Sequence, residues 1–281
     1  MIVKCFGARG SIPVSGAEFD EIGGNTTCVE VISDNDRIII DAGSGIIKIG
    51  DNYCNEKIKN INLFITHYHF DHIIGLPFFR PMFNSDYKIN IFGPSYKGKK
   101  VEDIIKNIIF PPAFPVDFKR LLKNKRFTFK TLEPGEEFNI GEIKIETISL
   151  SHPNGGLGYK FINNNKKFVF LTDNELDFKH KSGCSFKEYC DFSKNADLLI
   201  HDSEFLEKEY KASKSWGHSL FTSALDLAHC SKVKHFGLFH HNKCRSDSDV
   251  TKMIQDSIDY MNKNNMNFQI SAISQNFEFE I

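Results

Sequence analysis

The sequence predicts an α/β protein whose strands carry polar side chains at their ends. Short runs of apolar and β-branched residues alternate with segments that show helical spacing, and most of these runs stop at histidine, aspartate or glycine. Hydrophobic residues make up 41% of the 281 residues, and 27 residues are phenylalanine, which is enough to fill the layers of packed sheets. We therefore expect one large domain, or two lobes that share a sheet.

The first half of the chain is predicted to be rich in strands. Apolar runs bounded by glycine, asparagine, aspartate or proline predict strands over residues 2–6, 28–32, 37–40, 61–65, 87–92 and 127–132. Residues 101–109 have the apolar spacing of a helix, which the prolines at 111, 112 and 115 end.

The second half repeats this pattern with more helix. Strands are expected over residues 143–148, 159–162, 167–171, 196–200 and 233–239, with closing strands in 268–279. Helices are expected over residues 185–194, 220–230 and 248–262, the second capped by Ser219. Two β-rich halves that each end with helices hint at pseudo-symmetry, and no low-complexity linker divides them.

The overall charge gives no indication of a nucleic-acid coat or a membrane surface, so any nucleic-acid role must come from a local patch. Lys and Arg number 35 and Asp and Glu number 36, so the formal net charge is -1. The most basic stretch is residues 119–126. Such a stretch is usually a solvated face, but beside a metal site it would hold a substrate phosphate.

The cysteines and the amino terminus indicate a cytoplasmic protein. The 7 cysteines are scattered without a C-x-x-C pair, so we expect reduced thiols. The first residues lack a signal-peptide pattern, and no apolar run is long enough to span a bilayer.

The densest group of candidate metal ligands is residues 66–72, Thr-His-Tyr-His-Phe-Asp-His, directly after an expected buried strand. A single histidine is most often structural, but three imidazoles and a carboxylate within six residues are hard to explain in that way. We expect His67 and His69 to share one metal ion, while Asp71 and His72 turn toward a second. These nitrogen and oxygen donors suit zinc first, with manganese or iron as alternatives.

Five further strand ends carry candidate side chains. They are Asp41, His152, Asp173, Asp202 and His240. Asp41 is expected either to accept a hydrogen bond from a metal-bound histidine or to accept turn amides, two alternatives that the sequence leaves open.

The order H-x-H-x-D-H, then H, D and H, resembles that of the metallo-β-lactamase superfamily, and Asp41-Ala42-Gly43 resembles the aspartate motif that precedes its histidine cluster. The resemblance covers nearly the whole chain. It implies one domain over residues 1–281, an αββα four-layer sandwich of two mixed β-sheets flanked by helices, and a site for two divalent metal ions at one edge of the sheets.

The resemblance also implies a role for each ligand. One ion would take His67, His69 and His152, the other Asp71, His72 and His240, with Asp173 bridging them and a hydroxide between the ions as the nucleophile. We prefer His240 to His241 as the last ligand because it follows Leu238-Phe239 as the superfamily's last histidine follows apolar or small strand residues.

Two residues narrow the choice among branches of the superfamily: Asp173 favours the phosphodiesterase, glyoxalase and lactonase branches, and His69 disfavours the flavin-linked diiron members. Asp173 stands where antibiotic-hydrolysing members carry cysteine or serine, and His69 stands where flavin-linked diiron members carry an acidic residue. Residues 200–205 and 215–219 resemble the acid and the histidine-serine pair of tRNA 3′-processing endonucleases. Asp202 would orient His218, which would contact the scissile phosphate or protonate the leaving oxygen; alternatively His218 only caps a helix.

The substrate is expected to be small. The endonucleases carry a protruding arm between the lone histidine and the bridging aspartate, where this chain has room only for a hairpin, so a long nucleic acid is disfavoured. Loops 7–13 and 23–28 resemble those of armless members that act on cyclic nucleotides or cyclic phosphates, although the first alone would be taken for an ordinary turn. Arg9, Ser11, Asn25 and Ser219 are the candidate substrate contacts.

Two other functions remain open. A thioester or lactone hydrolase of the same fold would use the same metals without needing His218. A non-catalytic nucleotide-binding sensor would need no turnover at all. A homodimer is expected by analogy with such folds alone.

Overall fold

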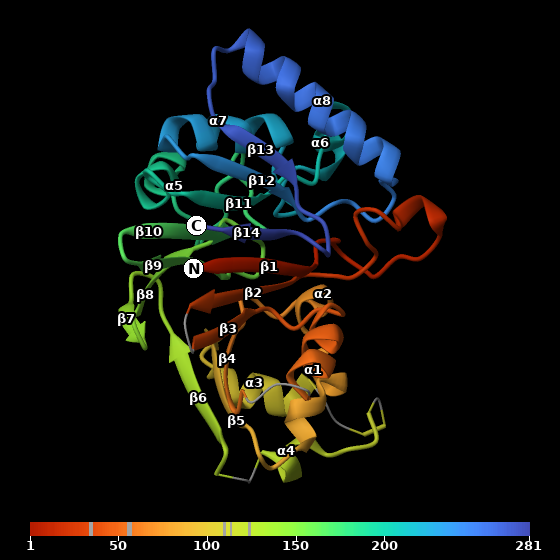
Figure 1. Ribbon diagram of the computed structural model, residues 1–281, viewed down its shortest axis with the longest axis vertical. Helices are drawn as coiled ribbons and strands as arrows, with labels where there is room; N and C mark the ends of the chain where they lie inside the picture. The colour runs from red at the N-terminus through yellow and green to blue at the C-terminus, as the bar shows by residue number, and fades with distance from the viewer. Residues whose placement is uncertain (34–35, 55–57, 109–110, 113, 123–124) are drawn as a thin grey trace.

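The protein consists of two seven-stranded sheets packed face to face with helices on both outer surfaces (Figure 1). This computed structural model describes residues 1–33, 36–54, 58–108, 111–112, 114–122 and 125–281. The sheets and helices below are those of the described residues.

The first sheet has the order β14-β1-β2-β3-β4-β5-β6. Its strands are β1 (Ile2–Gly7), β2 (Cys28–Ser33), β3 (Asp36–Ile40), β4 (Asn60–Phe64), β5 (Lys88–Pro94), β6 (Phe127–Leu132) and β14 (Glu278–Glu280). The pairs β14–β1, β1–β2 and β2–β3 are antiparallel, and the pairs from β3 to β6 are parallel.

The second sheet has the order β13-β12-β11-β10-β9-β8-β7. Its strands are β7 (Glu137–Ile140), β8 (Ile143–Ser149), β9 (Leu157–Asn163), β10 (Lys166–Leu171), β11 (Leu198–Asp202), β12 (His235–Phe239) and β13 (Gln269–Ala272). Pairs from β7 to β10 are antiparallel and pairs from β10 to β13 are parallel. Each sheet thus has one antiparallel and one parallel part, which supports the pseudo-symmetry that the sequence hints at.

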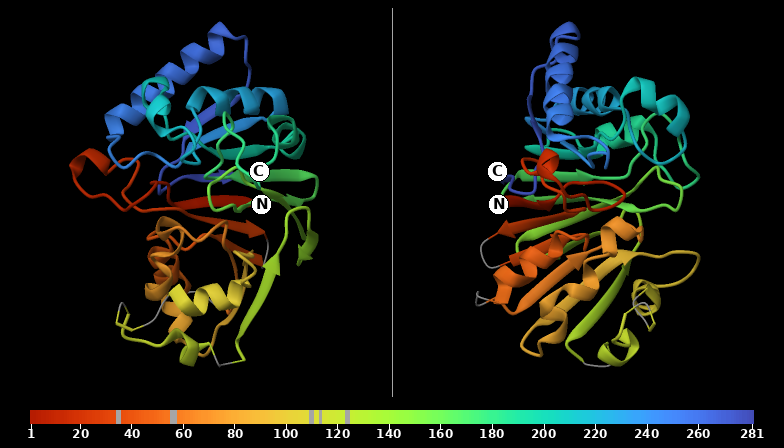
Figure 2. Two further views of the ribbon diagram at one scale, coloured as in Figure 1. Left: turned by 180° about the vertical axis from the view of Figure 1, so that it is seen from behind. Right: turned by 90° about the vertical axis from the view of Figure 1, so that its right-hand side faces the viewer.

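The helices form the two outer layers. Those packed on the first sheet are α1 (Ile46–Cys54), α3 (Val101–Ile108) and α4 (Phe118–Leu121), and those packed on the second are α5 (Phe186–Phe192), α7 (Phe221–Ser231) and α8 (Asp247–Lys263). The shorter segments are α2 (Phe70–Ile73), α6 (Glu207–Ser213) and the 3₁₀ turns η1 (Ala17–Phe19), η2 (Leu76–Phe78) and η3 (Arg80–Phe83). Figure 2 shows both layers from two further sides.

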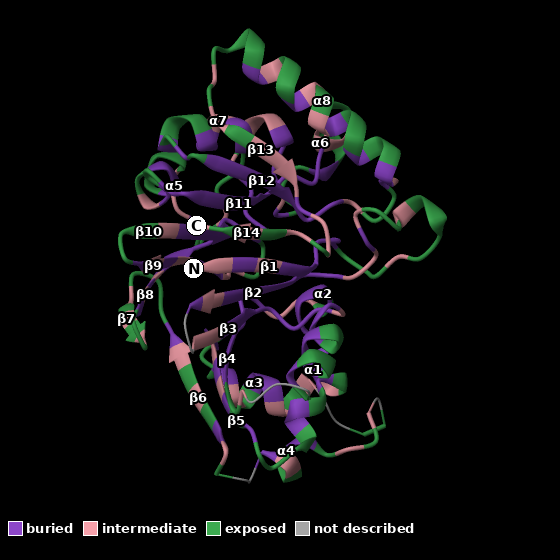
Figure 3. Ribbon diagram, viewed as in Figure 1, coloured by how far each residue is buried: buried purple, intermediate pink, exposed green. Residues whose placement is uncertain are grey.

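Alternation along the strands separates the layers. In β3, Ile39 packs under the helices of the first sheet, whereas Ile38 and Ile40 face the core shared with the second sheet. The central strands of both sheets are buried, and the exposed surface lies on the helices, the outer loops and the edge strands such as β6 and β7 (Figure 3). The predicted αββα sandwich of two mixed sheets is therefore confirmed.

Several sequence predictions need correction. The closing strands expected in 268–279 are β13 and β14, and they belong to different sheets, since β13 joins the second sheet and β14 returns to the first. Helix α7 begins at Phe221 after Leu220, so Ser219 is not its cap. Cys190 of α5 and Cys230 of α7 form a disulfide with Cα atoms 5.9 Å apart, so the prediction of reduced thiols throughout is wrong for this pair.

No helix in the described residues combines the length and apolarity needed to cross a bilayer. The most basic stretch, 119–126, begins in α4 and leads into β6, and its described residues line none of the cavities at the site described below. The expectation that this stretch holds a substrate phosphate is therefore not supported.

Candidate metal centre

All of the predicted ligands lie at the carboxyl ends of strands that meet at one edge of the two sheets. The cluster 67–72 follows β4, His152 follows β8, Asp173 follows β10 and His240 follows β12. Their side chains form two groups of donor atoms that share Asp173, and within each group the donors lie within 4.8 Å of one another. The structure thus brings together all seven predicted ligands from both sheets.

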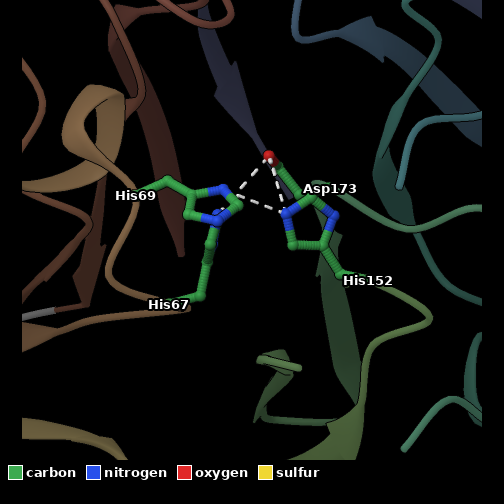
Figure 4. Close-up of side chains that lie close together, drawn as sticks. All are labelled: His67, His69, His152 and Asp173. Carbon is green, nitrogen blue, oxygen red and sulfur yellow. Dashed lines mark hydrogen bonds and ion pairs between the residues drawn. The ribbon is translucent and has the colours of Figure 1, made fainter. Parts of the chain in front are cut away.

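The first group consists of His67, His69, His152 and Asp173 (Figure 4). Nε2 of His152 lies 3.1 Å from Nδ1 of His69, and Oδ2 of Asp173 lies 3.5 Å from Nε2 of His67. Donors that share a zinc ion at about 2.1 Å lie about 3 to 3.5 Å apart, so these separations fit one ion.

The second group consists of Asp71, His72, His240 and Asp173. Oδ1 of Asp173 lies 3.2 Å from Nε2 of His72 and 3.3 Å from Nε2 of His240. Oδ2 of Asp71 lies 3.4 Å and 3.2 Å from the same two nitrogens. The two oxygens of Asp173 therefore face different groups, which is the arrangement expected of a bridging carboxylate.

Two further properties of the donors fit bound cations. The Nε2 atoms of His67 and His72 are buried, and neither has a hydrogen-bond partner within the described part of the chain, an unusual cost unless an ion binds there. Burial raises the pKa of Asp173, but the imidazoles of His240, His72 and His67 outweigh it and hold that pKa well below its ordinary value. Asp173 is thus ready to bind a cation as a carboxylate.

The imidazole of His72 is oriented by Asp41. Oδ2 of Asp41 accepts a hydrogen bond of 2.7 Å from Nδ1 of His72, which leaves Nε2 directed at the second group. The other carboxylate oxygen of Asp41 accepts the backbone N–H of Thr66. Asp41 therefore fulfils both alternatives that the sequence left open, since it holds a ligand histidine and also a turn amide.

The imidazole of His240 is oriented by Glu204, a residue that the sequence did not single out. Oε2 of Glu204 lies 2.9 Å from Nδ1 of His240, and its Oε1 accepts a hydrogen bond from Asn242. The one signal in the sequence that could have identified Glu204 was its position two residues after Asp202, the last residue of β11.

His241 does not reach the donors. Its Nε2 donates to the carbonyl oxygen of Ile273, and burial lowers its pKa to about 3. His240, in contrast, takes a left-handed backbone conformation with φ of 59° that aims its ring at Asp173. This geometry favours His240 as the last ligand.

His218 and Asp202 lie beside the second group. Nδ1 of His218 is 2.7 Å from Oδ2 of Asp202, and the ring of His218 stacks on that of His240 with centroids 4.7 Å apart. Burial opposes a charge on His218, but Glu204 and Asp202 outweigh it and raise the pKa of His218 to about 9. His218 does not cap α7, whose cap position is Leu220.

The loop that carries His218 is held by Glu175, another residue that the sequence did not predict. Its buried carboxylate accepts the backbone N–H groups of Ser215 and Gly217 and the hydroxyl of Tyr210. Gly217 has φ of 99° and lies so close to the ring of His152 that a Cβ would collide with it. The loop therefore packs directly on a ligand of the first group.

Three of the four predicted substrate contacts serve the scaffold instead. The guanidinium of Arg9 is fully buried and donates to the carbonyls of Gly23 and Arg245 and to Asp247, so the expectation that it binds substrate is wrong. Asn25 bonds to Ser44 and Gln275.

The hydroxyl of Ser219 is likewise occupied. It donates to the carbonyl of Asn174 and accepts the N–H of Leu176, which ties the His218 loop to the end of β10. Ser11 alone among the four lines the cavity at the metal centre, and its backbone N–H donates to Asp71. The loop before it approaches closely because Gly10 packs on the ring of His240.

Two cavities open at the metal centre. One, of about 430 Å³, is lined by Ser11, Asp71, Asp173, His218 and His240 together with 68–70. The other, of about 810 Å³, is lined by His67 and His69 of the first group and shares Tyr68 and His69 with the smaller one. A substrate in either cavity would lie against the predicted ligands.

Comparisons with known proteins agree with this architecture. Residues 36–241 match the model of the beta-lactamase superfamily domain. Ribonuclease Z of Picrophilus torridus is 25% identical over 284 residues, which cover 88% of each chain.

Two solved structures share the fold. The metallo-beta-lactamase fold protein YhfI from Bacillus subtilis superposes with a TM-score of 0.73 at 16% identity, covering 100% of this chain and 99% of that one. A diphosphatase from the PhnP family superposes with a TM-score of 0.67 at 17% identity, covering 100% and 96%. Because the model of this domain matches residues 36–241, most of the chain, the chain belongs to the beta-lactamase superfamily.

Proposed function

We propose that this enzyme, a metal-dependent phosphodiesterase, hydrolyses a small phosphodiester, with cyclic nucleotides and cyclic phosphates as its closest substrates. The observation that carries the proposal is the ion pair of His218 and Asp202, whose 2.7 Å contact holds an imidazole on the cavity wall next to the bridging Asp173. Ester hydrolysis at a dinuclear site does not by itself need such a pair, whereas a phosphodiester gains a proton donor for its leaving oxygen.

The seven donors would hold two divalent ions, zinc first and manganese or iron as alternatives, since nitrogen and carboxylate ligands suit all three. Such ions supply a water-derived nucleophile near neutral pH and bind the charge that develops on the phosphoryl oxygens. The protein's own task is to fix the ions: Asp41 and Glu204 orient His72 and His240, and Asp173 spans both groups.

His218 acts on the leaving group. Because Asp202 occupies its Nδ1, Nε2 is the ring nitrogen available to a substrate in the cavity. As the bond between phosphorus and the leaving oxygen breaks, Nε2 gives its proton to that oxygen, and Asp202 stabilises the charged imidazole before the transfer. The pKa of about 9 keeps His218 protonated at neutral pH, as this role requires.

The segment of the chain between His152 and Asp173 favours a small substrate. It is filled by β9 and β10, whose antiparallel pairing runs to Asn163 and Lys166 and leaves a turn of two residues. An arm that could grip a folded RNA has no room there. The short segment between His152 and Asp173 in the sequence leads to the same expectation.

Cleavage of RNA is the second candidate, because a curated relative that covers 88% of this chain is named Ribonuclease Z. Its active-site chemistry would be the same, and only the bound polymer would differ. The absence of an arm between β9 and β10 argues against the docking mode of the arm-bearing endonucleases.

A substrate panel tests the proposal. The zinc-loaded and manganese-loaded protein would be given cyclic mononucleotides, cyclic dinucleotides, a precursor tRNA, a thioester and a lactone, each with wild type and with His218→Ala. We expect cyclic phosphodiesters to be cleaved fastest and the variant to lose about a hundredfold in kcat. Preferred cleavage of the precursor tRNA would establish the second candidate. Preferred hydrolysis of the thioester or lactone with no effect of His218→Ala would contradict both.

A further inference from the structure

The larger cavity at the metal centre has features that the hydrolysis of one phosphodiester does not use. Its volume of about 810 Å³ is nearly twice that of the cavity above His218, about 430 Å³, and lies in the range that takes a whole drug-sized ligand. The two cavities share the walls formed by Tyr68 and His69. A substrate bound at the metal centre can therefore extend into the larger one.

One wall of this cavity is an ordered turn that presents a lysine. Tyr96 and Lys99 exchange two backbone hydrogen bonds of 3.0 Å, and between them Lys97 and Gly98 both take left-handed conformations, with φ of 49° and 75°. A positive φ is unfavourable for lysine, and such strain often marks a functional position. The turn fixes the backbone of Lys97 at the cavity.

A second lysine lines the same cavity. Lys181 and Ser182 line the cavity, and the carbonyl of Ser182 accepts the hydroxyl of Ser149 at the end of β8. Neither Lys97 nor Lys181 forms an ion pair with a carboxylate in the part of the chain that the structure describes. With Glu133 as the one carboxylate on the wall, the lining carries a net positive charge.

Polar side chains of the lining connect the turn that carries Lys97 to the metal centre. The hydroxyl of Tyr96 donates to the side chain of Asn154, whose amide lies 2.9 Å from Nε2 of His69. The ring of Tyr68 separates the two cavities, and its hydroxyl donates to the carbonyl of Pro94. The ammonium of Lys97 lies over the ring of Tyr96, 5.2 Å from the ring centroid, a contact that keeps this lysine at the lining of the cavity.

We propose that this cavity binds a second phosphate of the substrate through Lys97 and Lys181, so that the enzyme prefers phosphodiesters that carry a further phosphate, as in a 5′-phosphorylated or cyclic dinucleotide. The inference rests on the proposed function for the position of the scissile group. Two lysines that bind one phosphate form charge-assisted hydrogen bonds with it, which are stronger than neutral ones.

The test compares two ligands that differ by one phosphate. A dinucleoside methylphosphonate, whose linkage is not a hydrolysable phosphodiester, would be prepared with and without a 5′-phosphate. Binding of each to the zinc-loaded protein would be measured by titration calorimetry. We expect the phosphorylated ligand to bind about tenfold more tightly to the wild type. In the double variant Lys97→Ala, Lys181→Ala the ratio should fall to about one.

Lys99→Ala is the matched control, because Lys99 lies in the same turn but does not line the cavity, and it should keep the wild-type ratio. Equal binding of the two ligands by the wild type, or a ratio that survives the double substitution, overturns the proposal. Loss of the ratio in Lys99→Ala to the same degree would do so as well. Binding is measured without turnover, so this test does not depend on activity. If the protein hydrolyses no phosphodiester, the proposed function is contradicted, whereas the ratio of the two binding affinities still decides whether the cavity binds a second phosphate.

Discussion

Nδ1 of His218 lies 2.7 Å from Oδ2 of Asp202, while its ring stacks on the predicted metal ligand His240 with centroids 4.7 Å apart. One face of the imidazole thus rests on the ligand, one nitrogen is held by a carboxylate, and the other nitrogen is left for the cavity. The arrangement fixes the orientation of the His218 ring next to the predicted metals.

Removal of the Asp202 carboxylate should shift the pH dependence of turnover. The carboxylates of Glu204 and Asp202 raise the pKa of His218 to about 9, so Asp202→Asn should lower that pKa and move the basic limb of the kcat profile to lower pH. At pH 7 we expect a smaller loss in kcat than the approximately hundredfold loss of His218→Ala. The pH–rate profiles of both variants measure this, with the exposed His229→Ala as control. An unshifted basic limb in Asp202→Asn would show that the pair has no part in proton transfer.

Loss of either carboxylate behind the second group should weaken one metal ion and spare the other. Asp41→Asn and Glu204→Gln each remove the acceptor for a ligand imidazole, and we expect about tenfold to hundredfold weaker binding of one zinc ion per chain. Competition with a chromogenic chelator measures both affinities. The exposed Asp20→Asn should match the wild type. Equal weakening of both ions would mean that the groups are not separate sites.

The neighbouring histidines 240 and 241 form a matched pair. His240→Ala should lower the metal content from two ions per chain to about one, because it removes a donor of the second group. His241→Ala should keep both ions and instead cost about 1 to 3 kcal/mol of unfolding free energy, since it removes a buried hydrogen bond to Ile273. Elemental analysis of dialysed protein and chemical unfolding distinguish the two. Loss of metal in His241→Ala alone would reverse the assignment of the last ligand.

His201 should make the metal-free protein sensitive to acid. Burial lowers its pKa to about 4 from an ordinary 6.5, so between these values the unfolded chain binds a proton that the folded chain does not. The stability is complete above pH 6.5 and is lost as the pH falls toward 4, by about 3 kcal/mol in total. Between pH 6.5 and pH 4, the unfolding free energy of His201→Gln should therefore fall by about 3 kcal/mol less than that of the wild type. Parallel curves for variant and wild type would refute the assignment.

The ligands were predictable because they depend on local order along the chain. Each follows an apolar strand, and parallel strands of one sheet bring their carboxyl ends to one edge, so strand-end positions made His67, His152 and Asp173 candidates, while the superfamily resemblance gave them their roles as ligands. The αββα layering was likewise expected from the superfamily resemblance, and the structure confirms it.

What the sequence did not show depends on contacts between distant segments. Arg9 looked available because its loop is rich in glycine, and only the folded chain reveals Asp247 beside it, 238 residues away. Glu175 and Glu204 carry no motif of their own, since their function is to accept hydrogen bonds from loops that arrive later in the chain. The pairing of Cys190 with Cys230 required the packing of α5 on α7.

The most direct test of the account is hydrolysis of bis(p-nitrophenyl) phosphate by protein stripped of metal and then given zinc or manganese. Asp173→Ala is the control, since it removes the carboxylate that both donor groups share. We expect no turnover in the stripped protein, restored turnover on addition of metal, and loss of at least about a hundredfold in the variant. Bound metal without turnover of this diester, or turnover that persists in Asp173→Ala, would contradict a dinuclear phosphodiesterase.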